Sequence, residues 1–162
     1  MTYKIIDTNI VLLRADNMMT LGQDGSVVVL PETLLSEVDG KKAGMEEINY
    51  QARQVGRLIA SAELLGIDKT DFGTVTRMEL EGVQLRIVSL NEYEASHTEY
   101  GGNDKRIIQV ATTIQGIAGD GDEVKFITND VLCMLQALAV GLDASDLKVV
   151  EDDGYEFVKE LQ

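Results

Sequence analysis

Short apolar runs that do not alternate with polar residues constrain the fold of this chain more than any other feature. They occur at residues 3–7, 27–30 and 124–128, and a helical pattern follows each of them. Strands of continuous apolar character are typical of a parallel sheet that helices cover on both faces. We therefore predict an α/β fold of three layers (α/β/α) around a central, mainly parallel, twisted sheet.

The remaining elements fit between these strands. Apolar residues recur every three or four positions between Glu46 and Gly66, which is the strongest helical pattern in the chain. Two alternating segments predict a β-hairpin around residues 74–89. Further helices are expected at 8–16, 31–42, 103–119 and 129–141, and a last strand at 146–151. The helix at 129–141 is apolar on nearly all sides, which predicts that it is buried.

Length and composition predict a single domain spanning residues 1–162. No stretch reaches the roughly 18 consecutive apolar residues of a membrane span, and the N-terminus has no basic-then-apolar signal pattern. Cys133 is the single cysteine, so a disulfide framework is excluded and a reducing cytoplasm is the expected compartment. Its apolar helix contains no histidine, which favours a packing role for the thiol.

The formal net charge of −14 has two interpretations. It argues against sequence-independent binding to nucleic acid, which needs clustered lysines and arginines. The excess acid could serve solubility alone, or part of it could form a carboxylate cluster that a divalent metal neutralises. The positions of the acids must decide between the two.

Two aspartates follow predicted buried strands directly: Asp7 in "YKIIDTN" and Asp130 in "VKFITND". In open parallel sheets the functional crevice lies outside the carboxyl ends of the strands, so both should face it. Glu37, near the end of the helix at 31–42, and Asp104, at the start of the helix at 103–119, are placed to join them. Taken singly, each acid could instead be a helix cap or a solvated charge.

Four carboxylates in one cleft repel each other unless a cation compensates them. Oxygen ligands without histidine or cysteine favour Mg²⁺ or Mn²⁺ over zinc. Such a site suits hydrolysis of phosphodiester bonds, in which the metal provides a nucleophilic hydroxide and offsets charge in the transition state.

Four segments of the chain resemble, in order, the sequence blocks of PIN domains, a family of metal-dependent nucleases with a central parallel sheet. The segments are "IIDTNIVLL", "VVVLPETLLSEVDGKK", "NDKRIIQVA" and "FITNDVLCMLQALAVGLDA". The resemblance implies that Asp7, Glu37, Asp104 and Asp130 are the catalytic, metal-binding residues. It implies further that small polar residues beside the first and last acids orient carboxylates or water; these are Thr8, Asn9, Thr128 and Asn129.

The resemblance extends to the PIN domains that precede PhoH-type ATPases. "NYQARQVGRLI" is similar to their arginine-bearing helix, and the hairpin and the "NDKRI" segment also fit. The chain contains no G-x-x-x-x-G-K-[ST] loop, so no P-loop ATPase is present in it. It is therefore either a free-standing PIN protein or one domain of a longer one, and a PhoH-type ATPase or an inhibitor protein acting in trans is an open expectation.

The leading hypothesis is a Mg²⁺- or Mn²⁺-dependent endoribonuclease in the cytoplasm. RNA would be held by basic residues near the acids and on one helix edge: Lys41, Lys42, Arg53, Arg57, Lys105 and Arg106. A DNA structure-specific nuclease and a non-catalytic PIN scaffold that binds RNA or protein remain open, as does a homo-oligomer. A phosphatase with an Asp-x-Asp motif is disfavoured because position 9 is asparagine.

Overall fold

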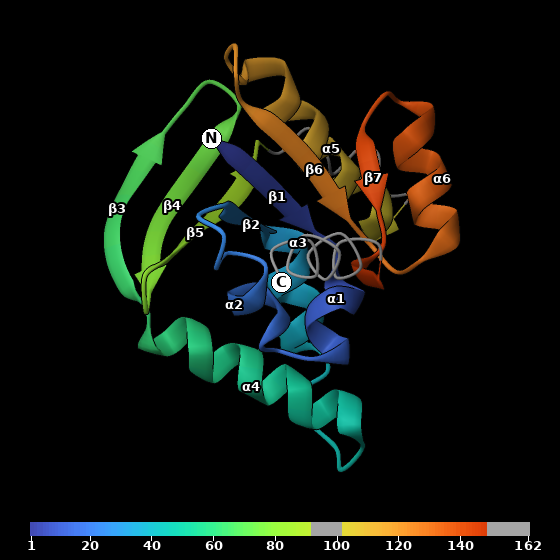
Figure 1. The fold of residues 1–162 in the computed structure, drawn as a ribbon. Coiled ribbons are helices and arrows are strands. Elements are labelled where there is room, and N and C mark those ends of the chain that lie inside the picture. The colour runs from blue at the N-terminus through green and yellow to red at the C-terminus, as the bar shows by residue number, and fades with distance from the viewer. Residues whose placement is uncertain (92–101, 149–162) are drawn as a thin grey trace, which may run out of the picture.

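One seven-stranded sheet organises the protein in the computed structural model, which describes residues 1–91 and 102–148 (Figure 1). The strand order is β3-β4-β5-β2-β1-β6-β7. The strands are β1 (Thr2–Ile6), β2 (Val27–Pro31), β3 (Glu63–Lys69), β4 (Gly73–Leu80), β5 (Val83–Leu90), β6 (Glu123–Ile127) and β7 (Asp143–Ser145).

Parallel pairing dominates the sheet, as the sequence predicts. β1 pairs in parallel with β2 on one side and with β6 on the other, β2 pairs with β5, and β6 pairs with β7. The register aligns Ile6 of β1 with Ile127 of β6, so these two central strands end at the same level. Whatever follows them in sequence emerges at one edge of the sheet.

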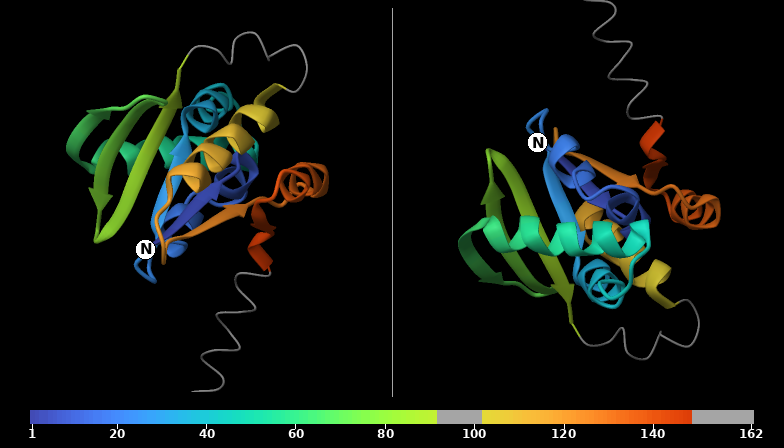
Figure 2. Two further views of the ribbon diagram at one scale, coloured as in Figure 1. Left: turned by 90° about the horizontal axis from the view of Figure 1, so that it is seen from above. Right: turned by 90° about the horizontal axis from the view of Figure 1, so that it is seen from below.

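Helices cover the two faces of the sheet and complete the three layers (Figure 2). They are α1 (Thr8–Leu13), α2 (Asn17–Thr20), α3 (Glu32–Asp39), α4 (Glu47–Ser61), α5 (Gly102–Ile117) and α6 (Val131–Ala139). One core cluster joins α1 to α4 with strand residues such as Ile6, Leu30 and Leu85. The other joins α5 and α6 with residues of opposite orientation, such as Ile5 and Phe126. The strands are thus apolar on both faces, which explains their continuous apolar sequence.

The predicted hairpin is confirmed as β4 and β5, and the structure adds a third strand to it. β3 pairs with β4 in antiparallel fashion, while β5 pairs in parallel with β2, so the hairpin extends the main sheet. The preceding helix, α4, ends at Ser61 and not near Gly66. The apolar residues after Ser61 fit a helical pattern in the sequence, but in the structure they form β3 and pair with β4.

The prediction that the helix at 129–141 is buried is wrong. In α6, Val131, Leu132 and Leu135 are 65%, 70% and 56% exposed, whereas Cys133 and Ala137 are fully buried. The helix lies beside β7 at the end of the sheet, where only one of its sides meets other elements (Figure 1). An apolar sequence therefore gives an exposed apolar face here.

Two further boundaries differ from the sequence prediction. The last described strand is Asp143–Ser145, earlier than the predicted 146–151, because these three residues align with Lys125–Ile127 of β6. Residues 149–151 lie outside the described part of the chain. Among the described helices, none combines the length and the apolar character that crossing a membrane requires.

A buried lysine anchors the turn between α2 and β2. The Lys4 ammonium donates a hydrogen bond to the Leu21 carbonyl at 2.9 Å and pairs with Asp24 at 3.0 Å. Burial alone would raise the pKa of Asp24, but hydrogen bonds from Ser26 and Lys4 outweigh it and lower the pKa to about 2. The folded state therefore favours the charged aspartate.

We predict that Asp24→Asn lowers the free energy of unfolding at pH 7 by on the order of 1 kcal/mol, a modest value because the Asp24 side chain is 61% exposed. The contribution of Asp24 is present above its unfolded pKa of about 3.9 and is lost as the pH falls toward about 2. Urea unfolding at pH 7 and pH 2 measures it, with the exposed Asp120→Asn as a control. An equal loss at both pH values would contradict the assignment.

Candidate functional site

The first aspartate of the site is fixed where β1 ends and α1 begins. The Asp7 backbone N–H donates to the Ile127 carbonyl at 2.9 Å, which continues the β1–β6 pairing by one residue. Its carboxylate accepts a 2.8 Å hydrogen bond from the Thr8 N–H, so Asp7 is the N-cap of α1. The same residue therefore ends the strand, starts the helix and presents a carboxylate at the sheet edge.

The Asp7 carboxylate is almost completely buried, at 3% exposure, and side chains hold it from two further directions. Its second oxygen, Oδ2, accepts hydrogen bonds from Asn9 Nδ2 at 2.9 Å and from Thr128 Oγ1 at 2.7 Å. These donors satisfy a buried charge and fix its orientation.

The second aspartate follows β6 in the same way. Asp130 is the N-cap of α6, and its Oδ1 accepts from the Leu132 N–H at 2.9 Å and the Cys133 N–H at 3.3 Å. The Thr128 hydroxyl, which donates to Asp7, also accepts a 3.1 Å hydrogen bond from the Asp130 backbone N–H. One threonine therefore links two aspartates that are 123 positions apart in sequence, at one edge of the sheet.

Glu37 and Asp104 reach the same place from helices. Glu37 Oε1, on α3, accepts a 2.7 Å hydrogen bond from the Thr8 hydroxyl. Asp104 lies in the first turn of α5, and its pKa is raised by burial and then by the charges of Asp7, Asp130 and Glu37. The structure thus brings together all four carboxylates that the sequence singles out.

Three of the four small polar residues contact the carboxylates directly: Thr8, Asn9 and Thr128. The fourth, Asn129, behaves differently. Its side-chain oxygen accepts from the Leu147 N–H at 3.0 Å and so holds the segment after β7, while its backbone N–H donates to Asn9 Oδ1 at 3.0 Å. Asn129 therefore acts on Asp7 through Asn9.

Cys133 belongs to this site, which the sequence did not indicate. Ligand atoms of Asp7, Asp104 and Cys133 lie within 4.8 Å of one another. Burial and the charges of Asp7 and Asp104 raise the pKa of the thiol, which keeps it protonated. The one available signal was its position three residues after Asp130, which places it one helical turn further along α6.

The donor set fits a hard divalent cation. Carboxylate oxygens converge, and none of the four acids forms a salt bridge within residues 1–91 and 102–148. Burial raises the pKa of Asp104, and the charges of the other three acids raise it further, as expected for carboxylates without a balancing cation. Mg²⁺ and Mn²⁺ prefer such oxygen ligands, and a neutral thiol is a poor ligand for either.

The basic residues that the sequence singles out divide into two groups. Arg53 Nη1 donates to the carbonyls of Lys42 and Gly44 at 2.7 and 2.9 Å, and the Lys42 ammonium pairs with Asp39, so both stabilise the loop between α3 and α4. The second group is Lys41, Arg57 and Lys105, which are exposed, and the partly buried Arg106. The Arg106 Nε is shielded from solvent and has no hydrogen-bond partner in the described structure.

Comparisons with known proteins identify a family and two similar proteins. Residues 4–148 match the family model of the PIN domain. The chain is 33% identical over 159 residues to protein PhoH2 of Bacillus subtilis (strain 168), an alignment that covers 92% of this chain and 34% of that protein. It is 25% identical over 164 residues to protein PhoH2 of Thermobispora bispora, with 98% and 35% covered. The chain thus spans about a third of the length of these curated relatives.

A solved structure supports the fold alone. It is described as a domain of a functionally unknown protein from Methanocaldococcus jannaschii DSM 2661. The alignment covers 90% of both chains with a TM-score of 0.52 and 18% sequence identity.

We predict that Asp104→Asn stabilises the metal-free protein at neutral pH. The substitution gives up a favourable charge at the start of α5, but the raised pKa shows that burial and repulsion outweigh that gain. A relief of about 1 kcal/mol corresponds to a Tm rise of about 2–4 °C for a chain of this size. Thermal unfolding in EDTA measures it.

The pH dependence provides the control for this prediction. Because the folded-state pKa of Asp104 is raised, the wild type loses stability relative to the variant as the pH rises through that pKa. The Tm difference should therefore disappear below about pH 3, where the carboxyl group is neutral. A wild type that is more stable than Asp104→Asn at pH 7 in EDTA would contradict the repulsion.

Proposed function

Because this chain belongs to the PIN domain family, we propose that it is a metal-dependent endoribonuclease that hydrolyses RNA phosphodiester bonds at the four-carboxylate site. PIN domains are generally metal-dependent nucleases. The observation that carries the proposal is the convergence of Asp7, Glu37, Asp104 and Asp130 without a balancing cation from the described residues. Chain positions far apart in sequence contribute to one acidic site, which structural packing alone does not require.

Asp7, Asp104 and Asp130 would hold Mg²⁺ or Mn²⁺, and Glu37 would complete the ligand set or position the attacking water. The ion would supply Lewis-acid activation of water and charge stabilisation at the phosphate. The thiol of Cys133 would remain a neutral hydrogen-bonding neighbour, since its pKa is raised.

The protein's own contribution is orientation. Asp7 is held by Thr8, Asn9 and Thr128, so the lone pair that remains on its Oδ1 points in a fixed direction before any ligand arrives. Glu37 is held by the Thr8 hydroxyl, which leaves its second oxygen available to accept a proton from water. Preorganisation of this kind lowers the reorganisation needed in the transition state.

Substrate binding must overcome the net charge of −14. Arg106 is two residues from Asp104 on α5 and forms no salt bridge with a described residue, so its guanidinium could bind a phosphate oxygen. Lys105 and Arg57 add exposed positive charge. We infer that RNA binding is loose and falls steeply as the salt concentration rises.

Attack by activated water would leave a 5′-phosphate and a 3′-hydroxyl. The same chemistry does not use the 2′-hydroxyl of the substrate, so cleavage of RNA and of DNA of equal sequence must be compared directly. Cleavage of DNA alone would replace the ribonuclease proposal by a DNA nuclease acting at the same carboxylates.

We predict that Asp7→Asn lowers kcat for Mn²⁺-dependent RNA cleavage by on the order of 100-fold or more. A 5′-labelled single-stranded RNA and a structured RNA provide the assay, with Asp120→Asn as the matched acid-to-amide control at an exposed position. Cleavage by Asp7→Asn at the wild-type rate would exclude the assigned site.

A second variant separates catalysis from folding. Asparagine is as good an N-cap as aspartate, so Asp130→Asn should preserve α6 and the fold while removing one charge from the site. Calorimetric titration with Mn²⁺ should show weaker uptake by this variant, whose Tm without metal should be no lower than that of the wild type. Absence of Mn²⁺ uptake by the folded wild type would favour a non-catalytic scaffold.

We predict that Arg106→Gln raises KM for RNA about tenfold while changing kcat little, because it removes a phosphate contact that is already made in the ground state. It should also lower the salt dependence of binding by about one unit of log-log slope. Arg14→Gln, which removes an exposed arginine that forms no hydrogen bond or salt bridge with the four acids, is the control. Equal KM values for both variants would remove Arg106 from the substrate-binding surface.

A further inference from the structure

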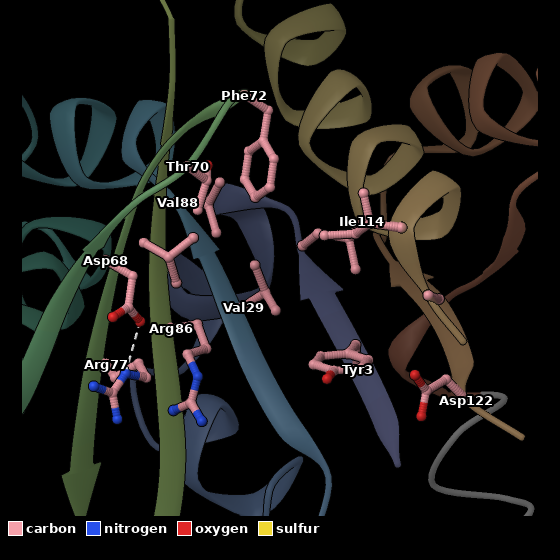
Figure 3. A pocket seen from close by; sticks show the side chains of 13 residues that line it. Tyr3, Val29, Asp68, Thr70, Phe72, Arg77, Arg86, Val88, Ile114 and Asp122 are labelled. Carbon is pink, nitrogen blue, oxygen red and sulfur yellow. Dashed lines mark hydrogen bonds and ion pairs between the residues drawn. The ribbon is translucent and has the colours of Figure 1, made fainter. Parts of the chain in front are cut away.

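A cavity of about 290 Å³ lies on the α5-covered face of the sheet, between the edge hairpin and α5 (Figure 3). One wall is formed by β3, β4 and β5, and the other by the C-terminal half of α5 with Ile114 and Ile117. None of the four carboxylates of the candidate active site lines it. The cavity is therefore a separate feature of the molecule.

Two arginines face each other directly at one end of this cavity. Arg77 of β4 and Arg86 of β5 are register partners across the antiparallel pair, and Val29 is the partner of Arg86 on β2. Like charges directly opposite each other destabilise a sheet. On the neighbouring strand β3, Arg77 lies opposite Gly66, and its guanidinium occupies the space that a β-carbon would take there. The β4–β5 register thus holds an unfavourable pair of charges together.

The negative charges in the cavity wall are already engaged. Asp68 pairs with Arg77 at 2.8 Å, and Asp122 pairs with the N-terminal ammonium group at 3.2 Å. Arg86 donates to the Leu85 carbonyl and to the Gln84 side chain, both at 3.1 Å, and forms no ion pair with any described residue. Burial, followed by the charge of Arg77, lowers the pKa of Arg86. Within residues 1–91 and 102–148, one positive charge at this end therefore remains unbalanced.

The rest of the wall is apolar. Val29 and Val88 lie between the arginines and Phe72 at the far end, and Tyr3 and Ile114 close the other side (Figure 3). A mostly apolar cavity with a few convergent polar groups is the usual form of a small-molecule site, and the volume is at the lower end for such sites.

We propose that this cavity binds a small organic anion, with its carboxylate or phosphate on Arg86 and Arg77 and an apolar or aromatic body against Val29, Val88 and Phe72. An oxyanion offsets the repulsion between the arginines, and planar guanidinium groups match its geometry. The apolar body displaces water from the strand and helix side chains that form the wall. The ligand would bridge the hairpin and α5.

Phenyl phosphate tests the proposal in metal-free buffer, where binding through an ion at the carboxylate site does not occur. Methyl NMR of the full chain should show saturable shifts at Val75, Val88 and Ile114, and none at α1 residues such as Val11. Inorganic phosphate and benzyl alcohol, which carry only one half of the ligand each, should bind at least about tenfold more weakly. Benzoate compares carboxylate with phosphate.

Arg86→Gln should weaken phenyl phosphate binding about tenfold or more, whereas Arg14→Gln should leave it unchanged. The wild-type NMR experiment needs no variant, so it decides the question even if Arg86→Gln fails to fold. Shifts outside the cavity only, equal affinity for inorganic phosphate, or unchanged binding by a folded Arg86→Gln would each overturn the proposal.

Discussion

The parallel pairing of β1 with β6 is the constraint on which the rest of this structure depends. It sets Ile6 beside Ile127, so Asp7 and the Thr128–Asp130 segment leave the sheet at one level. The hydroxyl of Thr128 then connects the two chain segments, because it donates to the Asp7 carboxylate and accepts from the Asp130 backbone. A shift of one residue in this register would turn these side chains to opposite faces of the sheet. The pairing of β1 with β6 is therefore sufficient to place Asp7 beside Thr128 and Asp130.

This arrangement concentrates negative charge that the fold itself does not neutralise. Hydrogen-bond donors surround Asp7, but no lysine or arginine of the described residues forms a salt bridge with the four acids. The salt bridges of lysines and arginines lie elsewhere: Lys4 with Asp24, Lys42 with Asp39, Arg77 with Asp68 and Lys125 with Glu123. The repulsion contributes at Asp104, whose pKa is raised by burial first and then by the charges of the other three acids. Asp7 and Asp130 stabilise helix N-termini, but repulsion among the four acids lowers the stability of the protein, and a cationic ligand would offset that repulsion.

The sequence was informative where a residue's position relative to a strand end determines its place. Asp7 and Asp130 could be placed because each follows a buried strand, and a parallel sheet brings such ends together. Asp104 and Glu37 lie on helices, so their approach depended on the family resemblance as well as on helix boundaries. The hairpin was visible from its alternation, but β3 was not, because its edge pairing follows from β4 and not from its own pattern.

The features that the sequence did not predict correctly all depend on how helices and strands pack against one another. The apolar sequence of α6 indicated burial, yet the helix lies at the end of the sheet, where its inward side is occupied by small residues such as Cys133 and Ala137. The role of Cys133 depended on which side of that helix faces Asp7, and Arg77 and Arg86 became neighbours only through the β4–β5 register. The sequence pattern of a segment predicts whether it forms a helix or a strand. The contacts of its side chains depend on strand register and on how the helices pack.

The net charge of the chain also fails to predict the charge around a particular site. A value of −14 describes the whole chain, but the field at a site depends on the few groups within a Debye length of about 8–10 Å. At the carboxyl edge of the sheet the acids are in excess, which favours a cation. Between β4, β5 and α5, one of two neighbouring arginines pairs with Asp68 and the other has no ion-pair partner among the described residues, which favours an anion. Both environments occur in one small sheet. Parallel pairing brings together acids that are far apart in sequence, and antiparallel pairing of the hairpin places Arg77 opposite Arg86. The pairing of the strands, more than the composition of the chain, therefore determines which ligands the protein can attract.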